Sequence, residues 1–200
     1  MDKDNVQKNL PVFSKEFLEE HYRLYPAAHQ NKIKEIEARL IKADTTMVNP
    51  TYCPLRSLKK EHTYALNSVK LHEYFFGNIE IEKNSLPSPE LLSMLDRHFG
   101  SVQEWEKEFF ALAMCSRGWV LLGFDLDEGV LRNFFSDNHP EGVWSVLPLL
   151  VLDVFEHAYC ADFPTRSVYI QEFLKCVKWE AVNQRLVVAN EVYKKINEIK

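Results

Sequence analysis

The sequence predicts an α+β protein, in which an N-terminal helical hairpin is followed by a mixed half of helices and strands. Two long segments in the first half repeat apolar residues at intervals of three and four, the spacing of an amphipathic helix. Residues 79–89 contain two prolines and few large apolar side chains, as interdomain linkers do. We therefore expect two domains, residues 1–82 and 83–200, each with its own pattern of elements.

The first helix is predicted over residues 14–40. Ser14 has the short hydroxyl side chain that favours an N-cap, and Phe17 and His21 begin an apolar stripe on one side. Pro26 lacks a backbone N–H in the middle of this pattern, so we expect a kink near residues 22–25. A second helix is predicted over residues 55–77, and the two helices would pair as an antiparallel hairpin.

The second half begins with two helices, marked by Ser88 and by Ser101 with Glu104, which form a capping box. Residues 119–124 and 130–135 then read as the strands of a β-hairpin around a turn at 125–129. A continuous apolar run at 146–152 predicts a third, buried strand. Two further helices are expected at about 167–177 and 180–199.

Composition excludes several classes of function. A chain of 200 residues that is 46% hydrophobic can bury a substantial core, and a net charge of -5 without a basic run gives no general attraction to nucleic acid or anionic lipid. The most apolar run, 143–155, falls short of the roughly 20 residues that cross a bilayer. The polar N-terminus has no apolar signal core, and the four cysteines lack CxxC spacing, so we expect a cytoplasmic protein with reduced thiols.

Four residues stand out as candidate metal ligands. His21 and His72 lie on the inner stripes of the two N-terminal helices, and Asp153 and His157 directly follow the third strand. Each alone is more often structural, as a hydrogen-bonded core histidine or a strand-ending turn. Together they make a site with three nitrogens and one oxygen, which suits iron or manganese and is also compatible with zinc.

The segment Leu152-Asp-Val-Phe-Glu-His-Ala-Tyr resembles the signature of the iron/manganese superoxide dismutases around the last two metal ligands. Glu20-His-Tyr is similar to the family's first ligand motif, and His72 falls at the second ligand position, although Leu71 stands where an asparagine is usual. Similar segments, at 117–124 and 177–182, extend the resemblance over about residues 13–185.

This resemblance implies a helical-hairpin domain joined to an α/β domain with a three-stranded antiparallel sheet. It implies one iron or manganese ion per subunit, held by the four ligands and alternating between +3 and +2 while superoxide becomes oxygen and hydrogen peroxide. In the family, the glutamate at the position of Glu156 crosses a dimer interface to the last histidine ligand. The chain is therefore expected to form a homodimer through Glu156 and His157.

Several family residues are replaced. The gateway tyrosine falls on His29, and the histidine four residues earlier falls on Tyr25. The glutamine that contacts metal-bound solvent comes from one of two places, which we align with Ser68 and Cys115. Two aromatic positions also differ, with Phe155 in place of a tryptophan and Cys160 in place of a tyrosine that faces the partner.

These replacements define the candidate catalytic residues. His29 is either a proton donor, with an ordinary pKa of about 6.5, or a structural histidine at the domain hinge. Cys115 is either reactive or inert packing. Tyr22 and Trp119 are expected to line the cavity. The other histidines are expected to be solvated or structural, without identified partners: His62, His98 and His139.

Three functions remain open at this stage. The first is a superoxide dismutase, which we favour. The second is a related metalloprotein with other oxygen or peroxide chemistry, because loss of the glutamine removes a control on the metal potential. The third is a non-catalytic structural protein on the same fold, against which the intact set of buried polar ligands counts.

Overall fold

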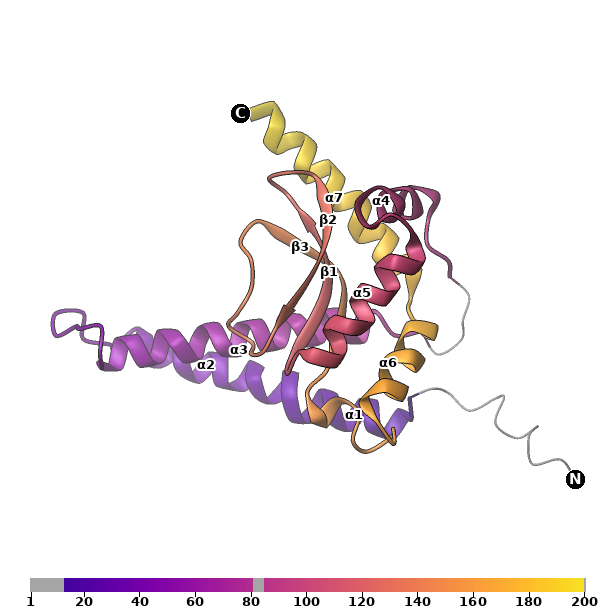
Figure 1. The fold of residues 1–200 in the computed structure, drawn as a ribbon. Helices are drawn as coiled ribbons and strands as arrows, with labels where there is room; N and C mark the ends of the chain where they lie inside the picture. Colours follow the sequence, from indigo (N-terminus) through magenta and orange to yellow (C-terminus); the bar gives the residue numbers. More distant parts are fainter. Residues whose placement is uncertain (1–12, 81–84, 200) are drawn as a thin grey trace, which may run out of the picture.

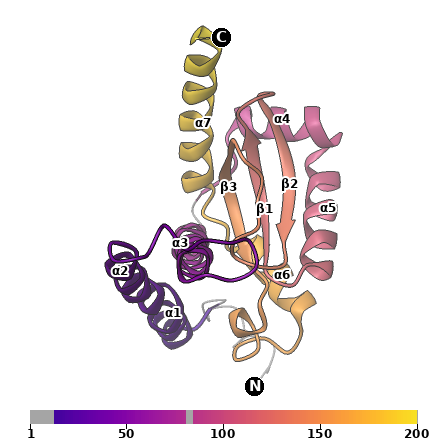
Figure 2. The same cartoon turned by 90° about the vertical axis from the view of Figure 1, so that its left-hand side faces the viewer.

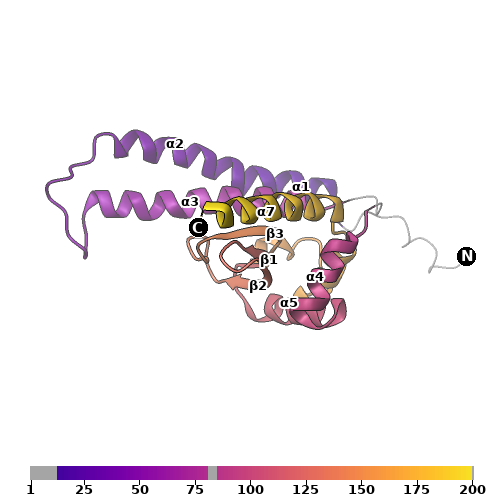
Figure 3. The ribbon, with the colours of Figure 1, turned by 90° about the horizontal axis from the view of Figure 1, so that it is seen from above.

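The N-terminal part of the molecule is a long helical hairpin that lies across the C-terminal part (Figures 1 and 3). The computed structural model describes residues 13–80 and 85–199. The predicted domain boundary between residues 82 and 83 lies outside the described residues, so the division into 1–82 and 83–200 stays a prediction.

The first arm of the hairpin is one continuous helical rod with an irregular turn inside it. It consists of α1 (Lys15–Tyr22), a π-helical turn η2 (Arg23–Ala27) and α2 (Ala28–Leu40). Ser14 caps α1 as predicted, since its hydroxyl accepts the backbone N–H of Phe17 at 3.1 Å. The irregularity expected at Pro26 takes the form of a π turn, in which one wider turn absorbs the missing backbone donor.

The second arm is α3 (Pro54–Gly77), which packs antiparallel against α2 (Figure 3). Cys53 caps its first turn and Pro54 occupies the first helical position, where its missing N–H costs nothing. The buried residues of α3 recur at three and four and form one stripe: Ala65, Ser68, Val69, His72 and Phe75.

The C-terminal part contains the predicted three-stranded antiparallel sheet. Its strands are β1 (Trp119–Asp125), β2 (Val130–Ser136) and β3 (Val146–Asp153), in the order β2-β1-β3. The register places Trp119, the first residue of β1, opposite both Ser136 and Asp153, the last residues of its neighbours. One edge of the sheet therefore gathers the start of β1 and the ends of β2 and β3.

Helices cover the sheet from several sides (Figure 2). α4 (Pro89–Phe99) and α5 (Val102–Cys115) contact β2, and α5 also contacts β1, while α3 and α7 (Trp179–Ile199) contact β3. The short 3-10 helix η3 (Glu156–Ala158) and α6 (Arg166–Lys175) lie between β3 and α7 in the chain. Among the described helices, none combines the length and the apolar character that crossing a bilayer requires.

Candidate metal centre

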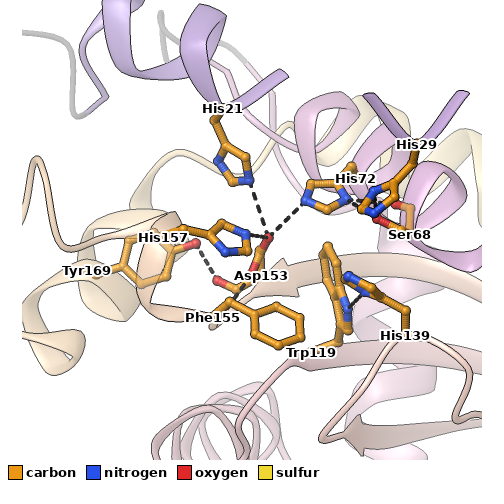
Figure 4. A network of polar contacts seen from close by, with 10 residues as sticks. All are labelled: His21, His29, Ser68, His72, Trp119, His139, Asp153, Phe155, His157 and Tyr169. Carbon is orange, nitrogen blue, oxygen red and sulfur yellow. Dashed lines mark hydrogen bonds and ion pairs between the residues drawn. The ribbon is translucent and has the colours of Figure 1, made fainter. Parts of the chain in front are cut away.

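Four side chains from four elements converge between the hairpin and the sheet (Figure 4). His21 comes from α1, His72 from α3, Asp153 from the end of β3 and His157 from η3. Their ligand atoms all lie within 4.8 Å of one another. Asp153 Oδ2 is 3.4 Å from Nε2 of His21, 3.4 Å from Nε2 of His72 and 3.3 Å from Nε2 of His157.

The main chain fixes the carboxylate of Asp153 at the centre of this group. Its Oδ1 accepts the backbone N–H of Phe155 at 2.9 Å, and its own carbonyl accepts the Tyr169 hydroxyl at 2.6 Å. Burial alone would raise the pKa of Asp153, but the surrounding histidines, His157, His21 and His72, outweigh it and hold this pKa well below its usual range. The carboxylate is therefore charged, with Oδ2 facing three imidazoles.

His72 is held in the tautomer that a metal ligand needs. Its Nδ1 lies 2.7 Å from the main-chain oxygen of Ser68, and because a carbonyl only accepts, Nδ1 carries the proton. Burial lowers the pKa of His72 to about 4, although Asp153 opposes this. The imidazole is therefore neutral at pH 7, and the lone pair of Nε2 points at the cluster.

The residues present fit a metal ion. Oδ2 of Asp153 and Nε2 of each of the three histidines are buried without a hydrogen-bond partner, although each nitrogen lies 3.3 to 3.4 Å from Oδ2. Leaving such groups unpaired costs about 1–3 kcal/mol each, more when charged. Donors that each lie roughly 2.0–2.2 Å from one shared ion have separations of this size. A cation at the centre would satisfy all four atoms at once.

Comparison with known proteins agrees with this geometry. Residues 87–185 match the family model of the C-terminal domain of iron/manganese superoxide dismutases. The chain is 31% identical to a superoxide dismutase [Fe] of Aquifex pyrophilus, over 98% of this chain and 95% of the relative. The chain belongs to the iron/manganese superoxide dismutase family.

Relatives of both metal types occur within this superoxide dismutase family. A superoxide dismutase [Fe] of Cupriavidus metallidurans is 29% identical over 90% of this chain and 91% of the relative. A superoxide dismutase [Mn] of Halobacterium salinarum is 37% identical over 60% of this chain and 62% of the relative. The predicted resemblance is confirmed, together with the fold that it implied.

His29 is linked to the candidate metal centre of this superoxide dismutase family member through Ser68. Its Nδ1 is 2.8 Å from Oγ of Ser68, the residue that also holds His72. In a regular α-helix, eight residues overshoot two full turns by about 80°. The wider turn η2 reduces this overshoot and brings His29 back toward the side of His21.

The environment of His29 changes one sequence-based expectation. Burial lowers the pKa of His29, and a hydrogen bond with the carbonyl of Tyr25 only partly opposes this effect. The ordinary pKa expected for this residue is therefore not retained, and the imidazole is neutral at pH 7.

Tyr25 takes the place beside His157 that the sequence assigned to a histidine in relatives. Its ring stacks on the ring of His157 with centroids 3.8 Å apart, and on His72 at 5.8 Å. Burial raises the pKa of Tyr25, and Asp153 and Cys160 raise it further, so the hydroxyl stays protonated. Tyr25 thus forms an uncharged wall against two of the clustered histidines.

His139 is a site residue that sequence reasoning missed, since it was expected to be solvated or structural with no identified partner. It is buried, its Nδ1 accepts the indole N–H of Trp119 at 2.9 Å, and its ring centroid lies 5.9 Å from that of His72 (Figure 4). His139 follows β2 by three residues, and β2 ends at the same sheet edge as β3. The register of the β-hairpin formed by β1 and β2 was the signal that could have placed His139 close to Asp153.

The other predicted residues are divided between the site and the surface. Trp119 is fully buried and its ring stands edge-on to His72, with centroids 4.9 Å apart. Tyr22 is 44% exposed and packs on Phe76. Cys115 is exposed at the end of α5, with Sγ 3.4 Å from the carbonyl of Leu112, and no described contact brings it to the cluster.

Two further histidines, expected to be solvated or structural, have partners that the sequence did not identify. Nε2 of His62 lies 3.3 Å from a carboxylate oxygen of Glu37, which joins the two arms of the hairpin. Nδ1 of His98 accepts the backbone N–H of Leu131 at 3.1 Å. Both are structural contacts away from the metal centre.

Proposed function

We propose that His21, His72, Asp153 and His157 hold one iron or manganese ion per subunit in an active superoxide dismutase. The observation that carries the proposal is a buried carboxylate oxygen with three imidazole nitrogens 3.3 to 3.4 Å away, none of them hydrogen-bonded. The chain converts two superoxide anions and two protons into one oxygen molecule and one hydrogen peroxide. The bound ion supplies the redox step by alternating between +3 and +2.

The donor set favours these two metals. Three imidazoles and one carboxylate leave coordination positions open, an arrangement that suits redox-active iron and manganese. The carboxylate offsets one unit of the charge of the ion. Trp119, fully buried beside His72, forms an apolar wall that excludes water from this side of the centre.

We assign proton delivery to His29. The dismutation consumes protons, and His29 is partly exposed on one side while Ser68 holds its Nδ1 on the other. An imidazole in this position can take a proton from solvent and pass it inward. Tyr22 packs on Phe76, whose ring contacts that of His21, and we keep it as a residue of the cavity wall. Cys115 is exposed, and we assign neither residue a proton-transfer step.

A homodimer is the second part of the proposal. Glu156 is exposed, and within the described part of its own chain its carboxylate has no partner. The His157 side chain is 23% exposed although its Nε2 is buried, so the opposite edge of the ring is accessible. This pattern supports a two-fold contact in which Glu156 reaches His157 of the partner subunit.

A cytoplasmic location completes the proposal. All four cysteines carry free thiols, including the exposed Cys115 and Cys160. Exposed thiols persist where the compartment is reducing.

The test combines metal analysis with a superoxide-consumption assay on the same purified sample. We expect the rate to rise in proportion to iron or manganese content, and His157→Ala to lose both together. His29→Tyr and His29→Gln should keep the metal but change the pH profile of the rate. Superimposable profiles at equal rates would remove the assignment of His29.

One observation favours a second candidate, a metalloprotein with other oxygen or peroxide chemistry. His29 and Ser68 stand where relatives have a tyrosine and, in one of two arrangements, a glutamine. A fully loaded wild-type protein that does not consume superoxide, but reacts with peroxide, would establish this alternative.

A further inference from the structure

Ser68 contacts two imidazoles through two different atoms. Its main-chain oxygen accepts Nδ1–H of His72 at 2.7 Å, while its hydroxyl oxygen lies 2.8 Å from Nδ1 of His29 and 3.4 Å from Nδ1 of His72. Serine in the middle of a helix usually turns its hydroxyl to solvent or back to a carbonyl one turn earlier. Ser68 is fully buried and instead directs its hydroxyl toward His29 on the other arm of the hairpin (Figure 4).

The direction of these hydrogen bonds follows from the groups involved. A serine hydroxyl has one donor hydrogen and two acceptor lone pairs. Nδ1 of His72 carries a hydrogen, so the serine oxygen is an acceptor toward His72, in a longer contact that supplements the carbonyl. The serine hydrogen is then free to be donated to Nδ1 of a neutral His29. With the hydrogen of His29 on Nε2, the tautomer that leaves Nδ1 as an acceptor, the donors point outward, from His72 to Ser68 and from Ser68 to His29.

We propose that Ser68 couples His29 to the metal ligand His72, so that the hydrogen bond made by the outer imidazole tunes the ligand at the ion. The inference rests on the proposed function of the cluster. Hydrogen bonds in such a chain strengthen one another, and a stronger acceptor at the outer nitrogen of a ligating histidine makes its inner nitrogen a better donor. Ser68 is thus a positioning residue for two histidines at once.

The two roles of Ser68 are separable by substitution. Ser68→Ala removes the hydroxyl but keeps the main-chain oxygen, so His72 should retain its tautomer and the protein its metal. Ser116 provides a matched control, because it is also buried and its hydroxyl has no hydrogen-bond partner in the described structure. Ser116→Ala therefore removes a buried hydroxyl without touching the proposed coupling.

The first experiment is NMR of the metal-free protein with nitrogen-labelled histidine. We expect His29→Gln to shift the Nδ1 signal of His72 when Ser68 is present, and to leave it in place in the Ser68→Ala background. Ser116→Ala should leave the Nδ1 signal of His72 where it is in the wild type. If His29→Gln leaves the Nδ1 signal of His72 unchanged when Ser68 is present, the proposal is overturned.

The second experiment measures the reduction potential of the metal-loaded protein. The outward chain of hydrogen bonds makes Nε2 of His72 a stronger electron-pair donor to the metal and stabilises the more highly charged ion. Ser68→Ala and His29→Phe should therefore each raise the reduction potential. The double variant should shift no further than either single variant, because both break one chain. Additive shifts would overturn the coupling. Neither readout uses dismutation, so an inactive protein that showed the coupling would defeat the proposed function alone.

Discussion

The indole N–H of Trp119 donates to Nδ1 of His139 across 2.9 Å, and both side chains are buried. An indole only donates, so Nδ1 of His139 must present its lone pair and the ring proton must sit on Nε2. Burial lowers the pKa of His139 to about 4, with repulsion from His72 acting in the same direction. The structure thus holds a neutral imidazole of fixed tautomer beside the candidate metal centre.

Substitution of His139 should reveal how much this pair stabilises the fold. His139→Phe leaves the buried indole N–H of Trp119 without an acceptor, which should lower the free energy of unfolding by about 1–3 kcal/mol. His139→Gln retains a carbonyl that can accept the bond and should cost less. Urea unfolding of the metal-free variants measures both, and equal losses would show that the bond contributes nothing.

Removal of the central charge should release the metal. Asp153→Asn keeps the size of the side chain and the acceptor for the N–H of Phe155, but it lacks the negative charge that faces three imidazoles. We expect metal content after dialysis to fall far below one ion per subunit. Asp96→Asn, at an exposed position on α4, is the control and should stay loaded. A stoichiometric Asp153→Asn protein would contradict the ligand assignment.

Acid should destabilise the metal-free protein at pH values above those at which carboxylates titrate. The folded pKa values of His72 and His139 are about 4, below the ordinary value of about 6.5. Between these values the unfolded chain binds more protons, so stability that is present above pH 6.5 is lost as the pH falls toward 4. The slope is about 1.4 kcal/mol per pH unit for each group.

Urea unfolding of the metal-free protein at pH 7, 6 and 5 measures this slope. His139→Gln should reduce it by the share of one histidine. A free energy of unfolding that stays constant over the range would show that the two imidazoles are not held neutral by the fold.

The proposed dimer contact is tested by Glu156→Ala. Sedimentation velocity at micromolar concentration should show a dimer for the wild type and a shift toward monomer for the variant. The variant lacks the exposed carboxylate that is proposed to contact His157 of the partner subunit. Glu106→Ala removes an exposed carboxylate from α5 and should sediment as the wild type does. A wild-type monomer would disprove the dimer.

Much of the fold could be predicted because local patterns determine it. Period-three-and-four stripes placed His21 and His72 on the inner sides of their helices, and the serine caps marked the starts of α1, α4 and α5. The apolar run of β3 ended at Asp153, which placed it next to His157 in η3. These features depend on neighbours within one turn or one strand.

What the sequence did not predict depends on contacts or backbone geometry that no local pattern reports. His139 reaches the site because β2 and β3 end at one edge of the sheet, and no local pattern around residue 139 reports this. Cys115 was given two possible roles, reactive or inert, from its position in the resemblance; it is exposed at the end of α5, and its role stays a prediction. Pro26 predicted an irregularity, but a kink and a π turn are equally compatible with a missing backbone donor.

The four proposed ligands come from α1, α3, β3 and η3, and this distribution has a consequence for biosynthesis. A ribosome completes the hairpin with His21 and His72 long before Asp153 and His157 emerge, so the nascent chain carries half a site. Two imidazoles without the carboxylate hold an ion weakly. Stable uptake must wait until β3 has paired with β1, and the ion then closes long loops, whose closure entropy it helps to offset. With these four ligands, metal insertion is expected to be a late step, after translation of the C-terminal half.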